Sequence, residues 1–342
     1  MVSIRKCLGK IKILSLIYVN LVIIKAVSSK IKTYKKLLNN KKLYSTENVR
    51  IKSNEKFVIN NMIYENYNLG LCDRLQGAVS VYYLIEKYKL SSVFKINFTY
   101  PFNLTLFLEP NLYNWVIDIK NVSFNTKEVN IILMFGIYWS KIESRLFRIY
   151  FLLKLKLSGK KQTHLYTNIQ LLDEKTFSKL FNELFKPTAA IQTEIDSYKA
   201  LINDSYISAT FRFQNLIGDF KELNIEPLIE QEKQELIDRC TEELLRLHNK
   251  NRDKKMLVTS DSTTFLKHIN KFDFTYIVEG DLVHMAFTDD GSFDLHKKSF
   301  IDLYMIAGAE KAYLLRTGAM YSSGFPRTAA KINLIPFEEI VF

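Results

Sequence analysis

The stretch YISATFR, residues 206–212, decides the fold. Its apolar residues predict a buried strand, and its arginine stands where that strand ends. A long helix is predicted next, at 226–249 with Pro227 in its first turn, and a second strand at 256–260. A strand, a helix and a strand at this spacing predict a parallel βαβ unit.

The same alternation continues on both sides of this unit. Downstream we expect helices at 262–269, 300–307 and 326–332 and strands at 276–279 and 312–315. Upstream we expect strands at 57–59, 92–98 and 129–138 and helices at 73–88, 143–157, 173–185 and 191–201. The sequence therefore predicts an α/β fold. Because 342 residues exceed what one core usually spans, it also predicts two domains, at 57–200 and 201–342.

Composition limits the class of protein. Apolar residues are 47% and charged residues 25% of the chain, as in ordinary globular proteins. The net charge of +12 favours anionic partners, which include nucleotides, nucleic acid and acidic membrane surfaces. The three cysteines are too scattered for a disulfide framework or a zinc site, so we expect free thiols and no metal.

Residues 1–56 form a basic and apolar N-terminal segment. Basic residues precede an apolar run at 13–24, a pattern that resembles a signal peptide or a short signal anchor. The run is short for a bilayer span, so a buried or interfacial helix is the alternative. The first interpretation predicts a secretory or membrane-associated protein and the second allows a cytoplasmic one.

Three candidate site positions follow predicted strands, where open parallel sheets bind their ligands. Arg212 could hold a diphosphate through two parallel hydrogen bonds, and the alternative is a pair with a carboxylate such as Asp219. The segment SSGFP, 322–326, precedes a helix, where free amides hold either an anion or an ordinary cap. Asp261 follows a strand and is equally well explained as a helix cap.

Two further positions have polar groups near predicted helix starts. Asp302 lies early in the helix expected from residue 300, where it either complements the helix dipole or accepts hydrogen bonds from a base. In NLGLCDRL, 68–75, a glycine turn leads into a helix that begins with Asp73 and Arg74.

The order of these motifs resembles that of the fucosyltransferase-like superfamily, which includes the α-1,2, α-1,6, nodulation and protein O-fucosyltransferases. The matching segments are GLCDRL (70–75), NFTYPFNLTLFLEPN (97–111), TFRFQ (210–214), LVTSDS (257–262), IDLYMIAGAEKAYLL (301–315) and SSGFPRTAA (322–330). Thr210 stands where the family has histidine, and Phe213 where it has a second arginine.

The resemblance implies a GT-B-like fold, in which two Rossmann-like domains with parallel sheets face a cleft. The N-terminal domain would bind the acceptor through the motif of Gly70, Asp73 and Arg74. The C-terminal domain would bind GDP-fucose, with no metal or cofactor. Arg212 would contact the donor β-phosphate, Asp302 the guanine, and the loop would contact the diphosphate. The loop residues are Ser323, Gly324, Phe325 and Arg327.

The leading hypothesis is an inverting, metal-independent glycosyltransferase that moves a sugar, fucose from GDP-fucose or another nucleotide sugar, onto a glycan or glycoprotein. Arg212 and Asp261 are its candidate catalytic residues. The alternative is a non-catalytic nucleotide- or carbohydrate-binding relative of the same fold. A nucleic-acid-binding protein is a third hypothesis that rests on charge alone and ranks last.

Overall fold

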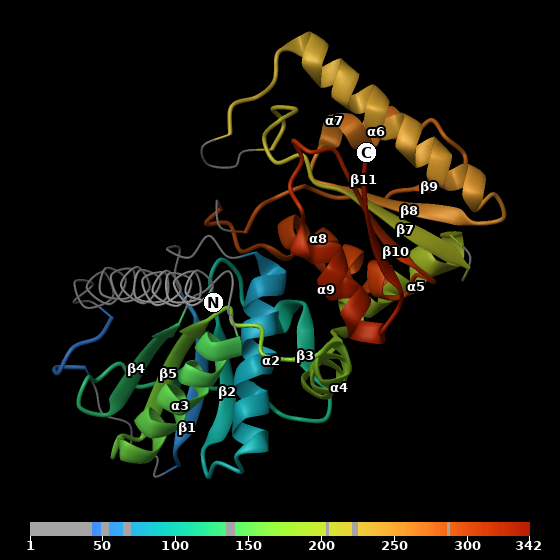
Figure 1. Cartoon of the computed structure of the whole chain (residues 1–342). Coiled ribbons are helices and arrows are strands. Elements are labelled where there is room, and N and C mark those ends of the chain that lie inside the picture. Colours follow the sequence, from blue (N-terminus) through green and yellow to red (C-terminus); the bar gives the residue numbers. More distant parts are fainter. Residues whose placement is uncertain are drawn as a thin grey trace, which may run out of the picture. The chain divides into compact units, whose positions relative to one another are not determined.

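The computed structural model describes residues 43–48, 55–63, 70–134, 141–202, 205–220, 225–285 and 288–342, with the backbone alone at 134 and 141–147. Nearly all of the basic and apolar N-terminal segment lies outside these residues. The chain divides into two compact units (Figure 1). Unit 1 comprises Met1–Ile59, Ser91–Val93 and Ile117–Ile169, and unit 2 comprises Asn60–Leu90, Phe94–Val116 and Gln170–Phe342.

A five-stranded parallel sheet forms the centre of unit 2. Its strands are β7 (Tyr206–Phe211), β8 (Lys255–Ser260), β9 (Thr275–Tyr276), β10 (Ala312–Arg316) and β11 (Phe337–Val341). Their order is β11-β10-β7-β8-β9, and the neighbouring strands run parallel. This is the order of a Rossmann-like sheet, in which the direction of winding reverses between β7 and β10.

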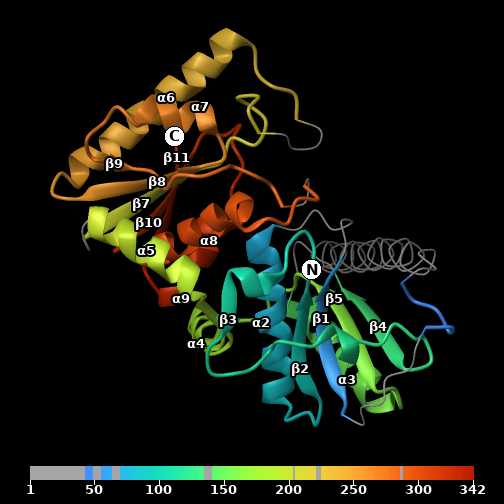
Figure 2. The ribbon, with the colours of Figure 1, turned by 180° about the vertical axis from the view of Figure 1, so that it is seen from behind.

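Helices cover both faces of this sheet (Figures 1 and 2). One face carries α6 (Glu230–Lys250) and α7 (Thr263–Ile269), and the other carries α5 (Ala189–Ile202), α8 (Phe293–Ala307) and α9 (Gly324–Asn333). Aromatic rings fill the core under α7, where Phe211 lies 4.7 Å and Phe213 5.0 Å from the ring centre of Phe265. The apolar sequence of β7 is therefore buried, as its pattern predicts.

Unit 2 also contains α2 (Leu71–Lys87), α4 (Glu174–Leu184), the short helix η1 (Leu104–Leu106) and an antiparallel pair, β3 (Leu108–Pro110) with β6 (Phe185–Pro187). Helix α2 packs against α4 and α9. Its Gln76 donates a 2.8 Å hydrogen bond to Thr328 of α9. The early motif at the start of α2 thus lies in the same compact unit as Arg212.

Unit 1 contains α3 (Lys141–Leu157), the short helix η2 (Ile119–Asn121) and the parallel strands β4 (Val129–Met134) and β5 (Gln162–Thr167). These strands belong to a sheet of order β2-β1-β5-β4, with β1 (Phe57–Met62) and β2 (Val93–Phe98) divided between the units. Polar side chains in β5 have hydrogen-bond partners: Nε2 of His164 donates to Oε1 of Gln162 at 3.0 Å, and Nδ1 of His164 lies 2.7 Å from the hydroxyl of Tyr44. Burial lowers the pKa of His164 to about 3.

The predicted α/β class with parallel sheets is confirmed, and several element boundaries are wrong. Helix α6 begins at Glu230 rather than 226, and the segment with Pro227 before it is not helical. The side chain of Glu232 marks this start, because it accepts a hydrogen bond from the amide of Ile229. Helix α8 begins at Phe293 rather than 300. Strands β3, β5, β6 and β11 are not predicted. Within the part of the chain described above, no helix is both long enough and apolar enough to cross a membrane.

Candidate functional site

Arg212 follows β7 directly, beside the point where the winding of the sheet reverses. Its Nη1 lies 2.9 Å from Oδ2 of Asp261, the residue that follows β8. Its guanidinium lies 4.7 Å from the ring centre of Phe220. The expected alternative partner, Asp219, instead accepts hydrogen bonds from the hydroxyl of Ser262 and the amide of Thr264, at the start of α7.

Asp261 fixes the position of Arg212. Besides the arginine, its carboxylate accepts hydrogen bonds from the amides of Phe213, at 2.8 Å, and Gln214, at 2.7 Å. Burial raises the pKa of Asp261 to about 6, and Arg212 and the two amides limit that rise. All three contacts of this carboxylate are with donors of the chain itself, one guanidinium and two backbone amides. Asp261 does not cap α7, because the N-cap residue is Ser262, whose hydroxyl accepts a 3.0 Å hydrogen bond from the amide of Phe265.

His284 is a site residue that sequence reasoning missed. Its ring lies 6.2 Å from that of Phe220, which also contacts Arg212. Burial lowers the pKa of His284 to about 4, and the charges of Arg212 and Arg74 add to this effect. The charges of Arg74 on α2 and of Arg212 at the end of β7 therefore both act on His284, in the segment after β9. A single histidine in an irregular segment gives no sequence signal for this arrangement.

The loop before α9 joins the same region. The amide of Tyr321 donates a 3.2 Å hydrogen bond to the carbonyl of Arg212. Ser323 caps α9, and its hydroxyl accepts from the amide of Phe325 at 3.2 Å. A Cβ atom added at Gly324 would meet nothing within 4 Å, so the first turn of α9 leaves room beside its backbone. The ordinary helix cap that the sequence allows here is therefore present, and the role of this loop in anion binding stays a prediction.

Arg327 lies in the first turns of α9 and is held by β11. Glu339 of that strand accepts hydrogen bonds from Arg327 at 2.8 Å, from Arg316 at 2.6 Å and from Ser322 at 2.8 Å. These attractions lower the pKa of Glu339, although its partial burial opposes them. Glu339 thus fixes both ends of the loop, and the guanidinium of Arg327 is held by its hydrogen bond to Glu339.

The early motif occupies the first turn of α2. Gly70 is the extended N-cap residue of that helix. Arg74 is only 2% exposed, and its Nη1 donates a 2.6 Å hydrogen bond to the carbonyl of Tyr100. Burial lowers the pKa of Arg74 to about 10 and raises that of Asp73. Cys72 contacts the carbonyl of Phe325 in α9, with sulfur and oxygen 3.9 Å apart.

Asp302 lies in the middle of α8, because that helix begins seven residues earlier than predicted. The helix dipole acts only near a helix end, so the expectation that Asp302 complements it is wrong. Its Oδ2 lies 2.9 Å from Nζ of Lys298, and both side chains are buried. Its Oδ1 is buried and, among the described residues, has no hydrogen-bond partner. Burial raises the pKa of Asp302, and Lys298 opposes the rise.

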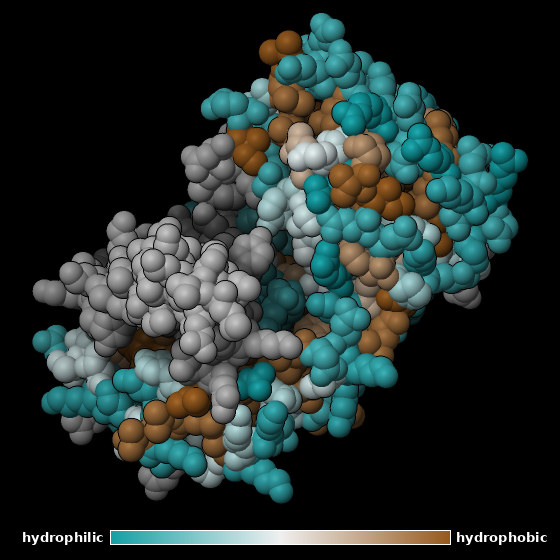
Figure 3. All heavy atoms as spheres, viewed as in Figure 1, coloured by the Kyte–Doolittle hydropathy of each residue, from teal (hydrophilic) through white to brown (hydrophobic). Residues whose placement is uncertain are grey.

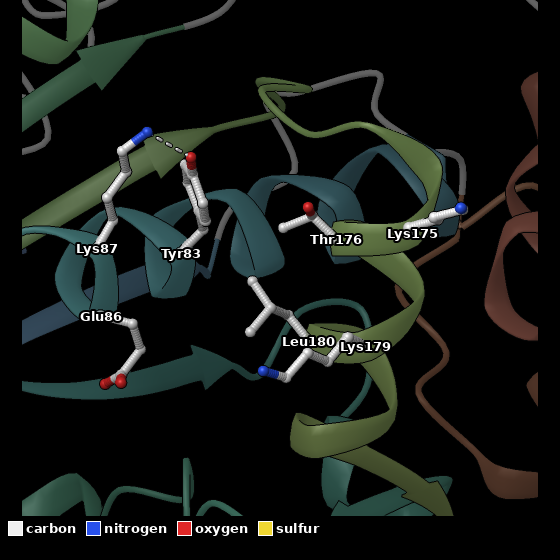
Figure 4. Close-up of a pocket in the computed structure, with 7 residues that line it drawn as sticks. All are labelled: Tyr83, Glu86, Lys87, Lys175, Thr176, Lys179 and Leu180. Atoms are coloured by element: carbon white, nitrogen blue, oxygen red, sulfur yellow. Dashed lines mark hydrogen bonds between the residues drawn. The ribbon is translucent and has the colours of Figure 1, made fainter.

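A surface groove of about 590 Å³ lies elsewhere in unit 2, between α2 and α4 (Figure 4). Lys87 donates a 2.7 Å hydrogen bond to Tyr83 at its edge. The lining residues are Tyr83, Glu86, Lys87, Lys175, Thr176, Lys179 and Leu180. None of the predicted site residues is among them. Across the described ranges, no group of three histidine, cysteine, aspartate or glutamate side chains is arranged to hold a metal ion.

The fold is similar to that of solved fucosyltransferase structures. The chain is similar to the NodZ α-1,6-fucosyltransferase in crystals soaked with GDP-fucose, with 13% identity, a TM-score of 0.51, and 84% of this chain and 95% of that chain covered. It is also similar to the fucosyltransferase NodZ from Bradyrhizobium in selenomethionine form, with 14% identity, a TM-score of 0.50, and 81% and 92% covered.

A mutant of FUT1 from Arabidopsis thaliana in complex with GDP gives 11% identity, a TM-score of 0.52, and 90% of this chain and 74% of that chain covered. No protein-family model matches the chain, and no curated protein sequence matches it. At these identities the likeness shows the fold. The resemblance inferred from the order of motifs is confirmed at that level.

Proposed function

We propose that this chain is a glycosyltransferase that moves a sugar, fucose from GDP-fucose, onto a glycan or glycoprotein acceptor. The observation that carries the proposal is Arg212, which stands at the carboxyl end of β7 where Rossmann-like sheets bind ligands. The loop that begins α9 is tied to the same backbone through Tyr321. An arginine and a helix start side by side suit a diphosphate.

In the proposed reaction Arg212 stabilises the charge that develops on the leaving GDP. A guanidinium has five N–H donors in a fixed plane, so it can serve a carboxylate and a phosphate together. Asp261 holds that plane in place before the donor arrives, which is the preorganisation that makes electrostatic catalysis effective. The loop of Ser323, Gly324 and Phe325 provides the second contact with the diphosphate through the amides of Ser323 and Gly324, since the amide of Phe325 donates to the hydroxyl of Ser323. The acceptor hydroxyl then attacks the sugar from the face opposite GDP and inverts its configuration, without a metal or a cofactor.

We assign the remaining predicted residues to the same reaction. Residues 201–342 bind the nucleotide sugar, with Asp302 toward its base, and residues 57–200 bind the acceptor. Gly70, Asp73 and Arg74 form the acceptor-side motif at the start of α2. Arg327 in α9 supports the diphosphate loop through its hydrogen bond to Glu339 of β11. The raised pKa of Asp73 suits a carboxyl that exchanges a proton with an acceptor hydroxyl.

A second candidate function is binding of a nucleotide sugar without turnover. The observation in its favour is that both residues predicted to contact the donor already form an ion pair within the protein. Arg212 pairs with Asp261, and Asp302 pairs with Lys298. A site in which these pairs persist would bind the donor without stabilising its departure. This candidate predicts donor binding with no release of sugar.

A thermal-shift panel tests the proposal. The purified chain is heated with GDP, GDP-fucose, GDP-mannose, UDP-sugars or ADP-sugars, and ligand at 100 times its dissociation constant stabilises by about 2.7 kcal/mol. We expect one GDP-sugar to stabilise the wild type and Arg246→Ala, whose arginine is exposed on α6, but not Arg212→Ala. No shift with any nucleotide sugar would refute the proposal. Binding without sugar release or transfer would select the second candidate.

A further inference from the structure

Helix α3 in unit 1 carries apolar side chains on its outer face. Ile149 is 48%, Tyr150 42%, Leu153 51% and Leu157 81% exposed, whereas Phe151 between them is fully buried. Each residue of an α-helix turns the chain by about 100°, so these four exposed side chains form one continuous stripe. Figure 3 shows hydrophobic side chains gathered on the surface over α3.

Two lysines border this outer face of α3 on opposite sides. At the same turn of about 100° per residue, Lys156 falls just beyond Ile149 at one edge of the stripe and Lys154 beyond Tyr150 at the other. Both lysines are exposed, and Nζ of Lys154 lies 5.8 Å from the ring centre of Tyr150. The one acidic residue in the sequence of α3 is Glu143 in its first turn, and residues 144–157, which include the stripe, contain none. Over the last turns of α3 the outer face is therefore apolar along its centre and positive along both edges.

We propose that this outer face of α3 is a docking surface for an anionic phospholipid membrane. An amphipathic helix binds in the plane of a membrane when its apolar stripe enters the headgroup region and its basic edges meet anionic lipids. Lysine stems can follow the apolar side chains inward while their ammonium groups stay with the headgroups. Among the described residues, other exposed apolar side chains such as Leu112 and Leu201 stand singly on other elements and form no comparable stripe.

Charge selects the membrane over two other occupants. A second copy of the chain docked on the same face would bring lysine edges against lysine edges. The chain's own apolar run at 13–24 is flanked by basic residues, among them Lys12 and Lys25. Docking of that run on α3 would therefore also bring positive charges against the lysine edges. An anionic lipid surface is the occupant whose charge complements the edges of the stripe.

A tryptophan reporter at the protein surface tests where the membrane contacts the full chain. Leu153→Trp places an indole in the stripe, and Leu112→Trp places one at an exposed leucine of unit 2 as the matched control. Each variant is mixed with vesicles of phosphatidylcholine alone, or with added phosphatidylserine, that contain brominated lipids. We expect phosphatidylserine-dependent quenching of the Leu153→Trp indole and none of the Leu112→Trp indole. This readout is local, so binding through residues 1–56 alone would leave the stripe reporter unquenched and overturn the proposal.

Charge and apolar variants give the second arm, with circular dichroism to confirm that each variant is folded. One lysine near an anionic surface contributes about fivefold in binding, so Lys154→Gln with Lys156→Gln should weaken vesicle binding by about thirtyfold. Leu153→Glu should abolish quencher access at the stripe. Binding that ignores both lysines contradicts the proposal. If the chain forms a dimer without lipid and Leu153→Glu dissociates it, the occupant of this face is a second copy, which would overturn the proposal. Blue-shifted emission of the Leu153→Trp variant without lipid would show a protein cover.

Discussion

Lys298 and Asp302 form an ion pair inside α8, and removing the lysine alone tests how that pair acts. The two charged atoms are 2.9 Å apart, with side-chain exposures of 2% and 9%. In Lys298→Met the apolar part of the side chain is kept and the positive charge is lost. Asp302 then remains buried without its counter-charge. Removing one partner of a buried pair costs about 3–5 kcal/mol, so we expect a loss of that size in the free energy of unfolding near neutral pH.

The loss should depend on pH in a defined direction. Burial raises the pKa of Asp302, and Lys298 opposes that rise, so its removal raises the pKa further. A carboxyl with a folded-state pKa above its unfolded value contributes stability at low pH that is lost as the pH rises. The deficit of Lys298→Met should therefore be largest near neutral pH and shrink toward about pH 4.

Urea denaturation followed by circular dichroism measures both effects, with Lys297→Met as the control. Lys297 is the neighbour of Lys298 and pairs with Asp294 at 3.0 Å on the surface, where such pairs contribute about 0–1 kcal/mol. Adding Asp302→Leu to Lys298→Met should recover most of the stability, since an apolar replacement leaves no buried charge. A Lys298→Met variant within about 1 kcal/mol of the wild type, or a deficit that does not shrink in acid, would refute the reasoning.

Three further predictions follow from single contacts. Asp261→Asn frees Arg212 from its carboxylate, so it should weaken donor binding by about tenfold in calorimetry; an unchanged affinity would show that Asp261 does not position the arginine. Gly291→Ala would place a Cβ atom 2.3 Å from the carbonyl oxygen of Pro101, which should cost about 1–3 kcal/mol in urea denaturation; a neutral effect would contradict that close approach. His284 has a pKa lowered from 6.5 to about 4, so its neutral form contributes stability above pH 6.5 that is lost as the pH falls toward 4. His284→Asn should flatten the decline of melting temperature over that range, and an unchanged slope would argue against a buried neutral imidazole.

Much of the fold is predictable because its strands and helices have distinct periods. Strand β7 and the later strand β8 are apolar runs between helices, and their parallel pairing follows from that alternation. Strand β5 could not be predicted in this way, because its buried residues include Gln162 and His164, whose partners Ser123 and Tyr44 are distant in sequence. The first turns of α8 depend on tertiary packing as well, since the ring of Phe293 stacks on Phe107 at 5.3 Å.

The candidate site was predictable only where residues stand at strand ends. Arg212 and Asp261 follow β7 and β8, and neighbouring parallel strands bring those ends together. Their direct pairing and the place of His284 beside Phe220 depend on loop geometry, which periodicity does not record. The position of Arg74 within unit 2 depends on the packing of α2 against α9.

Calorimetry with the nucleotide sugar that stabilises the chain tests the central claim, that Arg212 holds the donor diphosphate. Arg212→Lys keeps the charge and removes the planar pair of donors, whereas Arg316→Lys changes an arginine that Glu339 already holds. Hydrogen bonds to charged groups contribute about 1.5–3 kcal/mol, so Arg212→Lys should raise the dissociation constant by about tenfold to a hundredfold. Arg316→Lys should leave it within about threefold. Equal affinities of Arg212→Lys and the wild type would contradict the account.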